Sequence, residues 1–251
     1  MKDQYKIQQA TSHTKESSLN SYMKLVFGQT SIAKLLLYEF VMTVAAKFPG
    51  AAGILLRKLL FPWVLKSVGR NVIFGSGITL RHPHKISIGD NVIIDDYVSL
   101  DAKGDSNQGI RLDNGVFLGR NSILSCKNGD IHLKENANLG FNCLITSTNS
   151  VTIGKDNIIA AYTYLMGGGN YHIDDLNTPI RELYDYDGKG GVETGENVWL
   201  GGKVSILDGV KVGSGCVVAA NSVVTKSLIE NSIAMGCPAK IIRQRGKPDS
   251  K

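Results

Sequence analysis

Residues Thr194 to Thr225 decide the fold, and in groups of six they read TGENVW, LGGKVS, ILDGVK, VGSGCV, VAANSV and VT. An aliphatic or threonine residue opens each group, and a small or β-branched residue such as Val198 or Cys216 follows four positions later. A period of six matches neither a helix nor a long alternating strand. It is typical of very short strands joined by tight turns, three to a coil, with one side chain of each group buried inside a prism. The stretch therefore predicts a parallel β-helix.

The same register extends toward the N-terminus as triplets of aliphatic residues spaced by six. The triplets are Ile88, Ile94 and Leu100; Leu112, Leu118 and Leu124; Leu133, Leu139 and Ile145; and Ile153, Ile159 and Leu165. Extra residues occur only after a third group, so every insertion should leave the prism at one corner. We expect an all-β fold of about six coils, roughly 30 Å tall. Leu118, Leu139, Ile159, Leu200 and Val218 should point inward.

Composition sets the broad class of the protein. The chain has 251 residues, of which 43% are hydrophobic and 20% charged, and its formal net charge is +6. A repeat architecture of this length needs no second core. The positive charge suits an anionic ligand without identifying one, and nothing in the sequence indicates nucleic-acid binding. Cys126, Cys143, Cys216 and Cys237 lack the spacing of metal ligands and are expected to be reduced, free thiols. We expect a cytoplasmic protein.

The N-terminal part changes character twice. Residues 1–21 are polar, lack the apolar centre of a cleavable signal sequence, and are expected to be disordered. Residues 22–70 carry two broad apolar helical stripes, Leu35–Val44 and Ile54–Trp63, separated by Phe48-Pro49-Gly50. Charged residues interrupt both stripes, so neither is expected to span a bilayer. The segment is expected to cap the prism, which solenoids require; the alternative is a basic amphipathic segment in which residues 22–68 lie on the inner membrane surface.

Three histidines lie outside the long loop described below. His82 and His84 flank Pro83, which is not a spacing of metal ligands, and they are expected to be polar loop residues. His132 lies between Ile131 and Leu133, so alternation should turn it outward on a coil face. A metal site is not expected.

Residues 86–243 resemble the left-handed parallel β-helix, hexapeptide-repeat acyltransferases, and in particular sugar O-acetyltransferases such as the galactoside and maltose enzymes. The motifs that carry the resemblance are GFNCLI at 140–145, MGGGNYH at 166–172, NVWLGG at 197–202, AANSVVTK at 219–226 and GCPAKIIR at 236–243. It implies a left-handed β-helix domain over 71–243 with one excursion loop, 166–193, and a basic tail over 244–251. It also implies a homotrimer that uses acetyl-coenzyme A.

The resemblance places the coenzyme in a groove between neighbouring prisms. The positions that match this groove are Gly202, Ala220, Thr225 and Lys226, while Lys240 and Arg243 match basic residues near the coenzyme phosphates. Small residues allow close approach of a pantetheine arm, and fixed cations suit phosphates.

The loop between Leu165 and Thr194 is the only long excursion, and such loops are usually functional. Acyl transfer to a hydroxyl needs a base with a pKa near neutrality, and His172 is the only histidine of the loop. The resemblance implies a histidine base near the start of this loop, although Asn170 directly follows the three glycines here. Asn142 matches an acceptor-binding position, and Asp174 is a candidate for holding the acceptor or His172. Ser147 and Thr148 stand where relatives carry an aspartate.

These features predict direct transfer of an acetyl group to a hydroxyl of a sugar or lipid-linked polysaccharide precursor, with a backbone amide near Gly201–Gly202 stabilising the oxyanion. An N-acetyltransferase acting on an amino sugar would share nearly every motif. A serine-type acetyltransferase would carry a larger helical domain, and a carbonic-anhydrase-like metal protein would need three facing histidines. A non-catalytic scaffold would need no basic C-terminal groove. The acceptor itself cannot be read from the sequence.

Overall fold

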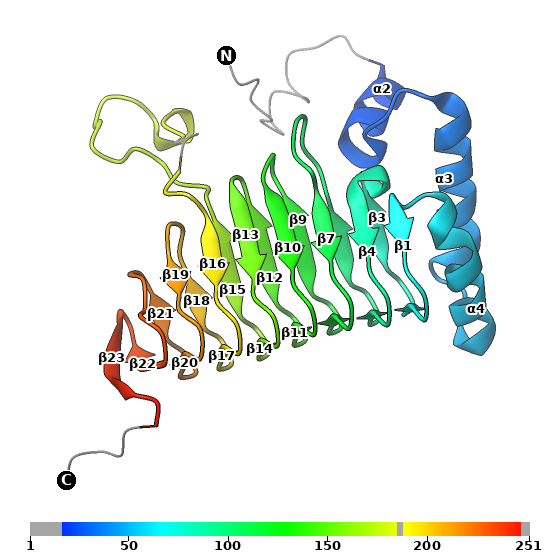
Figure 1. Cartoon of the computed structure of the whole chain (residues 1–251). Coiled ribbons are helices and arrows are strands. Elements are labelled where there is room, and N and C mark those ends of the chain that lie inside the picture. Colours follow the sequence, from blue (N-terminus) through cyan, green and yellow to red (C-terminus); the bar gives the residue numbers. More distant parts are fainter. Residues whose placement is uncertain (1–16, 185–187, 247–251) are drawn as a thin grey trace.

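The computed structural model, which describes residues 17–184 and 188–246, is a parallel β-helix closed at its N-terminal end by helices (Figure 1). Three parallel sheets form the sides of the prism, and the chain visits sheets A, B and C in turn. Sheet A contains β1 (Ser67–Val68), β4 (Ile86–Ile88), β7 (Ile110–Leu112), β10 (Asp130–Leu133), β13 (Ser150–Ile153), β16 (Val192–Thr194) and β19 (Lys211–Val212). Sheet B contains β2 (Ile73–Phe74), β5 (Ile93–Ile94), β8 (Phe117–Leu118), β11 (Asn138–Leu139), β14 (Ile158–Ile159), β17 (Trp199–Leu200), β20 (Val217–Val218), β22 (Ser232–Gly236) and the antiparallel β23 (Ala239–Gln244). Sheet C contains β3 (Thr79–Arg81), β6 (Ser99–Asp101), β9 (Ile123–Cys126), β12 (Leu144–Ser147), β15 (Tyr164–Gly167), β18 (Ser205–Ile206) and β21 (Val223–Val224).

The coil count is higher than the six predicted. Strands β1 to β21 make seven complete coils, and β22 starts a further turn that β23 ends. The additional coil is the first one, β1 to β3, whose inward residues Phe74 and Leu80 precede the register that begins at Ile88. Two extra residues between Leu80 and Ile88 break the period of six, because the chain makes a short 3-10 turn, η3 (Pro83–Lys85).

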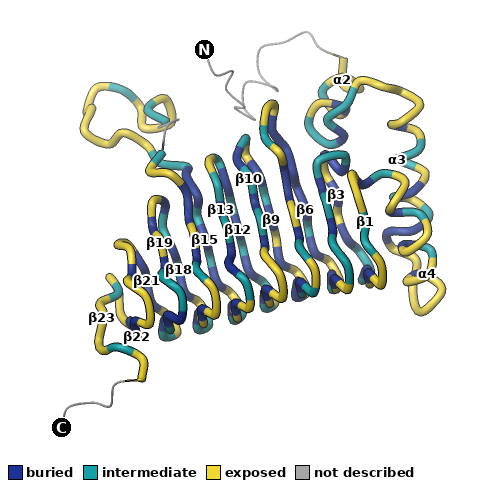
Figure 2. Tube along the Cα trace, viewed as in Figure 1, coloured by how far each residue is buried: buried dark blue, intermediate teal, exposed yellow. Residues whose placement is uncertain are grey.

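The interior of the prism is a continuous stack of aliphatic side chains. Leu118, Leu139, Ile159, Leu200 and Val218 are all at most 2% exposed, which confirms the predicted register (Figure 2). Each belongs to a two-residue strand of sheet B whose other residue faces outward. Cys143 and Cys216 are buried in the same interior, and all four cysteines are free.

The three corners of the prism differ in length. The corners between sheets A and B and between sheets B and C are two-residue turns whose second residue has a positive φ, as at Asn142 and Tyr162. The corner between sheets C and A takes all the insertions, including 168–191, which emerge on one side of the prism (Figure 1). This confirms the predicted single corner; the long loop is two residues shorter at each end than expected, because β15 and β16 extend into it.

The N-terminal helices cover the open end of the first coil. They are α2 (Ser18–Tyr22), the π-helix η1 (Met23–Phe27), α3 (Ile32–Ala45), α4 (Gly50–Leu60) and the 3-10 turn η2 (Phe61–Trp63). Val41, Ala45 and Phe61 join the core of the prism, and Tyr38 donates a hydrogen bond of 2.7 Å to the Leu80 carbonyl. Helix α2 begins at Ser18, within the range 1–21 for which disorder is expected, and residues 1–16 lie outside the described part.

A buried arginine fastens α4 to the prism. Arg57 is only 1% exposed and donates hydrogen bonds to the carbonyls of Phe74 (2.9 Å), Ala45 (3.1 Å) and Phe48 (2.8 Å). Burial lowers its pKa from the ordinary value of arginine. One guanidinium thus joins α3, the break after it, α4 and the first coil, which makes the inner face of the helices a true cap.

His82 and His84, expected to be polar loop residues, lie at the η3 turn between β3 and β4, where neither side chain is exposed. His82 is 3% exposed and lies with Nε2 3.0 Å from the Lys24 carbonyl, while its backbone amide donates to Val26 at 2.9 Å. The two imidazoles stack at 5.9 Å, and both Nδ1 atoms are buried without a partner in the described structure. Burial, with His82 and Lys85 nearby, lowers the pKa of His84 to about 4. The pair holds the segment 23–28 against the prism.

Within residues 17–184 and 188–246, no single helix meets the length and hydropathy of a membrane span, whereas Ser18–Phe27 and Ile32–Ala45 meet them together across a 66° bend.

Candidate active site

The outer faces of the sheets differ sharply in polarity. On sheet A the outward residues are polar: Ser87, Arg111, His132, Thr152, Glu193 and Lys211. On sheet B the outward residues include the exposed Ile73, Ile93, Ile158 and Trp199. Sheet C also exposes Ile123, but exposed apolar side chains are most numerous on sheet B, which indicates a surface that contacts something other than water.

The corner between sheets B and C carries a strip of small residues along its C-terminal half. The first residue of successive turns at this corner is Asp96, Arg120, Phe141, Ala161, Gly202 and Ala220. Amides of the second turn residues join the coils, for example Lys203 to the Ala161 carbonyl (3.0 Å) and Asn221 to the Gly202 carbonyl (2.9 Å). The large side chains of the first coils thus give way to a smooth edge at Ala161, Gly202 and Ala220.

Gly202 differs from the other glycines of the described chain. A Cβ at Gly201 would lie 2.6 Å from the Ala220 nitrogen, so the fold itself requires glycine there. A Cβ at Gly202 would meet only the Ala161 carbonyl, at an ordinary 3.5 Å, and the residue has no positive φ. The Gly202 amide also has no acceptor within the described residues, whereas the Gly201 amide donates to Val218 at 2.8 Å. Nothing within the described residues accounts for glycine at 202.

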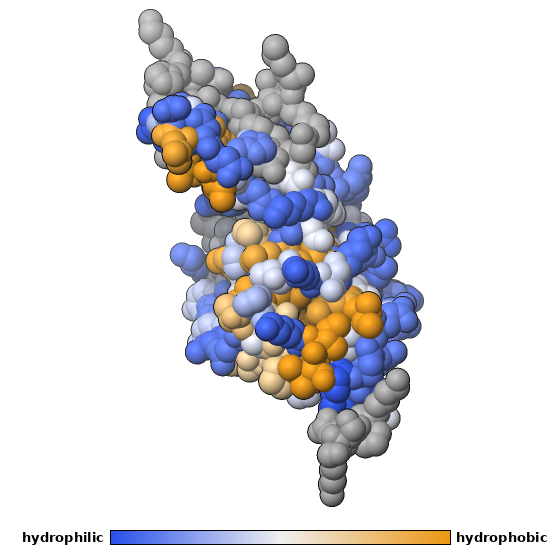
Figure 3. All heavy atoms as spheres, turned by 90° about the vertical axis from the view of Figure 1, so that its left-hand side faces the viewer, coloured by the Kyte–Doolittle hydropathy of each residue, from blue (hydrophilic) through white to orange (hydrophobic). Residues whose placement is uncertain are grey.

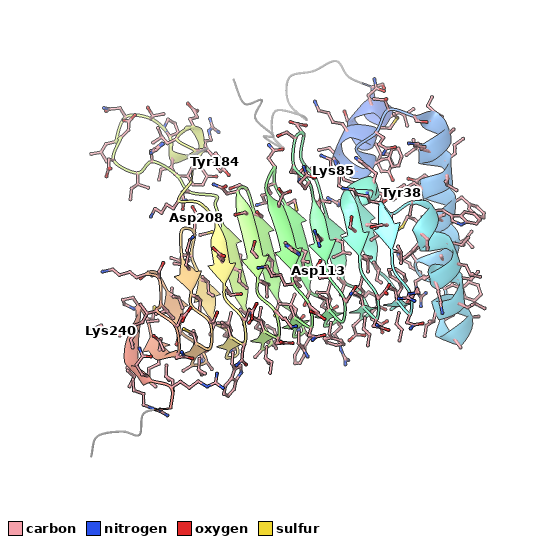
Figure 4. The ribbon with its side chains drawn as sticks, viewed as in Figure 1. Tyr38, Lys85, Asp113, Tyr184, Asp208 and Lys240 are labelled. Carbon is pink, nitrogen blue, oxygen red and sulfur yellow. The ribbon has the colours of Figure 1, made fainter. Side chains whose placement is uncertain are left out.

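The basic candidates lie at the end of the same edge. Lys240 and Arg243 are exposed on β23, and Lys240 pairs with Met235 next to the turn that continues the strip beyond Ala220 (Figure 4). Thr225 and Lys226 are also exposed, but they follow β21 at the corner between sheets C and A. The predicted coenzyme-binding residues therefore lie on two different edges of the prism. Gly202 and Ala220 lie at the corner between sheets B and C, and Thr225 and Lys226 lie at the corner between sheets C and A.

The long loop carries the predicted base at its neck. Tyr171 and Tyr184 form an antiparallel bridge, with their rings in edge-to-face contact at 5.3 Å, and the His172 amide donates to the Leu183 carbonyl at 2.8 Å. The short 3-10 turn η4 (Ile180–Glu182) follows within the loop. His172 and Asp174 are exposed, and the described structure contains no hydrogen bond or ion pair between them. The structure thus does not supply Asp174 as the partner of His172.

Asp208 anchors this loop, a role that the sequence reasoning missed. Asp208 Oδ2 accepts from Asn170 Nδ2 and from the Lys189 amide, both at 2.6 Å, and Oδ1 accepts from the Gly191 amide at 2.8 Å. Its side chain lies beneath the loop, with Tyr184 at the neck (Figure 4). One buried carboxylate thus ties both ends of the loop to the coil. Its only signal in the sequence is an aspartate directly before the Gly209 turn.

Asn142 lies on the edge that carries Gly202, two coils closer to the N-terminus. It is the second residue of its turn, with a φ of 55°, and its amide donates to the Arg120 carbonyl at 2.9 Å. Asparagine tolerates this left-handed conformation, which accounts for part of its presence. Its side chain is half-buried, and the ring of its neighbour Phe141 packs edge-to-face on Tyr162 at 5.9 Å.

Within one chain the two halves of the candidate site do not meet. His172 and Lys226 belong to the corner between sheets C and A, while Gly202, Ala220 and Asn142 belong to the corner between sheets B and C. The chain crosses sheet C between these corners in the six residue steps from Gly202 to Asp208, a span of roughly 20 Å. A complete site from these residues requires a second chain.

A separate polar cluster lies on sheet A. His132 Nε2 is 2.8 Å from Asp113 Oδ2, and Arg111 Nε is 2.8 Å from Asp113 Oδ1 (Figure 4). Partial burial raises the pKa of Asp113, but the hydrogen bonds from Arg111 and His132 outweigh it and lower the pKa below its usual range. His132 is outward as predicted. Within the described ranges, no group of three or more histidine, cysteine, aspartate or glutamate side chains is placed to hold a metal ion.

Comparison with known proteins agrees with the repeat. Residues 191–226 match the model of the bacterial transferase hexapeptide family, described as six repeats. The chain is 37% identical over 124 residues to a putative lipopolysaccharide biosynthesis O-acetyl transferase of Escherichia coli, covering 46% of this chain and 61% of that protein. It is 28% identical over 184 residues to a probable acetyltransferase of Mycobacterium tuberculosis, covering 73% of this chain and 58% of that protein. The chain thus spans a little over half the length of these relatives.

Among solved structures, the polysialic acid O-acetyltransferase OatWY superposes with a TM-score of 0.54 at 23% identity, over 74% of this chain and 87% of that one. At this identity the likeness shows the shared fold.

Proposed function

We propose that this chain, a member of the bacterial hexapeptide-repeat transferases, transfers an acetyl group from acetyl-coenzyme A to a hydroxyl of a sugar or polysaccharide precursor. The observation that carries the proposal is the edge at Ala161, Gly202 and Ala220. At Gly202, where the fold does not require glycine, this edge has no side chain. The cations of Lys240 and Arg243 lie at its end. A pantetheine arm is slim and polar, so it fits against exposed backbone, and the phosphates attached to it suit Lys240 and Arg243.

The chemistry follows from what the residues offer. The acceptor hydroxyl attacks the thioester carbonyl while the His172 imidazole takes its proton, so no acyl-enzyme is formed. Negative charge then develops on the carbonyl oxygen, and the unused amide of Gly202 is a donor for it. Collapse of this tetrahedral intermediate forms the ester and breaks the C–S bond, and the departing thiolate of coenzyme A takes the proton from His172. The amide of Gly201 already donates a hydrogen bond to the Val218 carbonyl. Of the two amides expected as donors to the oxyanion, only that of Gly202 therefore remains.

The active assembly that we propose is a homotrimer with sites between neighbours. His172 and Lys226 of one chain would meet Gly202, Ala220 and Asn142 of the next, because a single chain separates these sets. The exposed apolar residues of sheet B, including Ile158 and Trp199, are the surface that this packing would bury.

A thermal-shift measurement tests the coenzyme edge. Acetyl-coenzyme A should raise the melting temperature of the native protein in a dose-dependent way, because a ligand of the folded state stabilises it. Gly202→Val should melt close to the native temperature without ligand, since an added Cβ at this position meets only the Ala161 carbonyl, at 3.5 Å, and should lose most of the shift.

Ser76→Val is the matched control, because Ser76 is the corresponding turn residue in the first coil, far from the proposed edge. It should keep the full ligand shift. An undiminished shift in Gly202→Val would place the coenzyme elsewhere. Assays with neutral sugars and with amino sugars then separate O-acetylation from the alternative, N-acetylation of an amino sugar.

A further inference from the structure

The helical cap has an unusual outer surface. On α3 the residues Ile32, Leu36 and Phe40 are exposed at successive turns, and on α4 and η2 the same spacing exposes Leu55, Leu59 and Trp63. We call these six residues the outer helical face. An ordinary surface helix carries polar residues on the side opposite its core stripe, so large apolar side chains there indicate a further contact.

The packing of the helices fixes the direction of this face. Helix α3 buries Leu35, Tyr38, Val41 and Ala45 against the prism and α2–η1, and α4 buries Gly53 and Arg57. Leu36, Phe40, Leu55 and Leu59 lie on the opposite sides of their helices. The two helices stand at the N-terminal end of the prism, so the outer helical face belongs to the end of the molecule and not to its sides (Figure 1).

Charge is concentrated in the same segment. Residues 17–70 contain seven lysines and arginines and a single acidic residue, Glu39, and therefore carry a formal charge equal to the +6 of the whole chain. Glu39 accepts a short hydrogen bond from Tyr22. Lys34, Lys47, Lys58 and Lys66 are exposed in the helices and the segments beside them. Lys34 and Lys58 belong to the same helices as the outer helical face, and Lys47 lies in the break between them, so the apolar stripe shares its two helices with cations.

We propose that the outer helical face binds the surface of an anionic phospholipid bilayer. Apolar side chains among lysines are the composition of helices that lie in the headgroup region, where leucine, phenylalanine and tryptophan enter the acyl boundary and lysines meet anionic headgroups. Arg57 and Tyr38 hold α3 and α4 on the prism, so the cap would approach the bilayer as a preformed, rigid surface.

A second copy of the chain fits this face less well. Two caps facing each other would bring the exposed Lys34, Lys47 and Lys58 of each chain together, and like charges across an interface disfavour association. Anionic lipid offers the complementary charge.

Vesicle sedimentation tests the proposal with the full-length protein. The native protein should sediment with vesicles of phosphatidylcholine and phosphatidylglycerol at about three to one, and should remain in solution with phosphatidylcholine alone. Leu36→Ser combined with Leu59→Ser should lower the partition coefficient at least about tenfold. Replacing Lys34, Lys47 and Lys58 by glutamine should lower it about a hundredfold, at about fivefold per lysine.

The matched control lies at the opposite end of the prism, where apolar side chains are also exposed beside basic residues (Figure 3). Leu36 and Leu59 are 65% and 56% exposed, and Ile229 and Ile242 are 65% and 55% exposed. Ile229→Ser combined with Ile242→Ser should therefore sediment like the native protein. Circular dichroism and gel filtration confirm that each variant keeps its fold and its assembly.

Three results would overturn the proposal. The first is no sedimentation with anionic vesicles, and the second is an equal loss in the control variant. The third is a native assembly whose mass halves in Leu36→Ser with Leu59→Ser, which would make the face a contact between copies. None of these results depends on catalysis, so each leaves the proposed transferase activity standing.

Discussion

His172 is exposed at the neck of the long loop, and its imidazole has no hydrogen-bond partner in the described part of the chain. The backbone around it is ordered by the Tyr171–Tyr184 bridge, so the side chain is held at a defined place while its nitrogens are free to accept a proton. This combination is what a general base in a site shared with another chain requires.

We expect His172→Ala to lower kcat by roughly 10²–10⁴-fold, the usual contribution of a general base. Affinity for acetyl-coenzyme A, measured by thermal shift, should stay close to native, because the proposed coenzyme contacts come from Gly202, Ala220, Lys240 and Arg243 and not from the His172 imidazole. His132→Ala is the control and should retain nearly full turnover, since His132 faces outward on sheet A beside Asp113. Native turnover in His172→Ala with an accepted sugar would place the base elsewhere.

For single residues, the sequence predicted which side chains point into the prism. It did not predict the contacts that residues make with inserted loops or with the N-terminal helices. The period of six identified inward residues such as Leu139 because burial in a prism depends only on local register. The role of Asp208 as the anchor of the long loop could not be predicted, because its three hydrogen-bond donors come from residues 170, 189 and 191. The positions of these residues depend on the path of the loop. The burial of His82 and His84 was not predicted for the same reason, because the segment that covers His82 lies 58 residues away in sequence.

The long loop behaves as an element with two anchored ends. Replacing Asp208 by asparagine keeps the shape but turns an amide NH₂ toward backbone donors, and hydrogen bonds to a charged group contribute about 1.5–3 kcal/mol each. We expect Asp208→Asn to leave global melting nearly unchanged while trypsin cleaves faster after the exposed Arg181. Asp113→Asn, at a hydrogen-bonded carboxylate on sheet A, should cleave at the native rate. An unchanged rate in Asp208→Asn would mean that the carboxylate does not restrain the loop.

The segment formed by α2 and η1 should respond to acid. Burial lowers the pKa of His82, and the pKa of His84 falls to about 4 from 6.5. The unfolded state therefore binds protons below pH 6.5 that the folded state refuses, and stability falls as the pH decreases toward about 4. Hydrogen exchange of residues 17–28, corrected for its intrinsic pH dependence, should show protection decreasing from pH 7 to pH 4.5. A variant with His82→Gln and His84→Gln should lose this pH dependence of protection. If the native protein shows no pH dependence, protonation of the two histidines does not release residues 17–28 from the prism.

The helices illustrate how far a sequence can be interpreted at the scale of elements. The break at Phe48-Pro49-Gly50 and both helical stripes were predictable, and α3 and α4 lie where the stripes place them. The sequence favours a cap, because solenoids require one, but an apolar helix suits a membrane segment as well, which is the alternative. In the structure, the inner sides of α3 and α4 pack on the first coil, and Arg57 holds them there. The outer sides of the same helices form the outer helical face, for which we propose lipid binding.

At the scale of the molecule, polarity divides the prism lengthwise. Sheet A presents Arg111, His132, Glu193 and Lys211, whereas sheet B presents Ile158 and Trp199. Such a division could not be seen in the sequence before the assignment of each hexad to a sheet. In the proposed trimer the three caps would lie at one end of the assembly, and simultaneous binding by three outer helical faces would strengthen attachment to a bilayer beyond that of one chain.

The shared site makes a prediction that only an assembly can fulfil. If each site combines His172 of one chain with Gly202 of the next, His172→Ala and Gly202→Val chains are both inactive alone, yet every mixed trimer contains one site in which both residues are native. Random reassembly of equal amounts should therefore restore about a quarter of native activity, since a closed ring of three has one such junction in each mixed assembly. The measurement is acetyl transfer after unfolding and refolding the two variants together, with separately refolded variants mixed afterwards as the control. Sedimentation should give the mass of three chains in each case. A site built within one chain would show no recovery, because every chain in the mixture carries a defect.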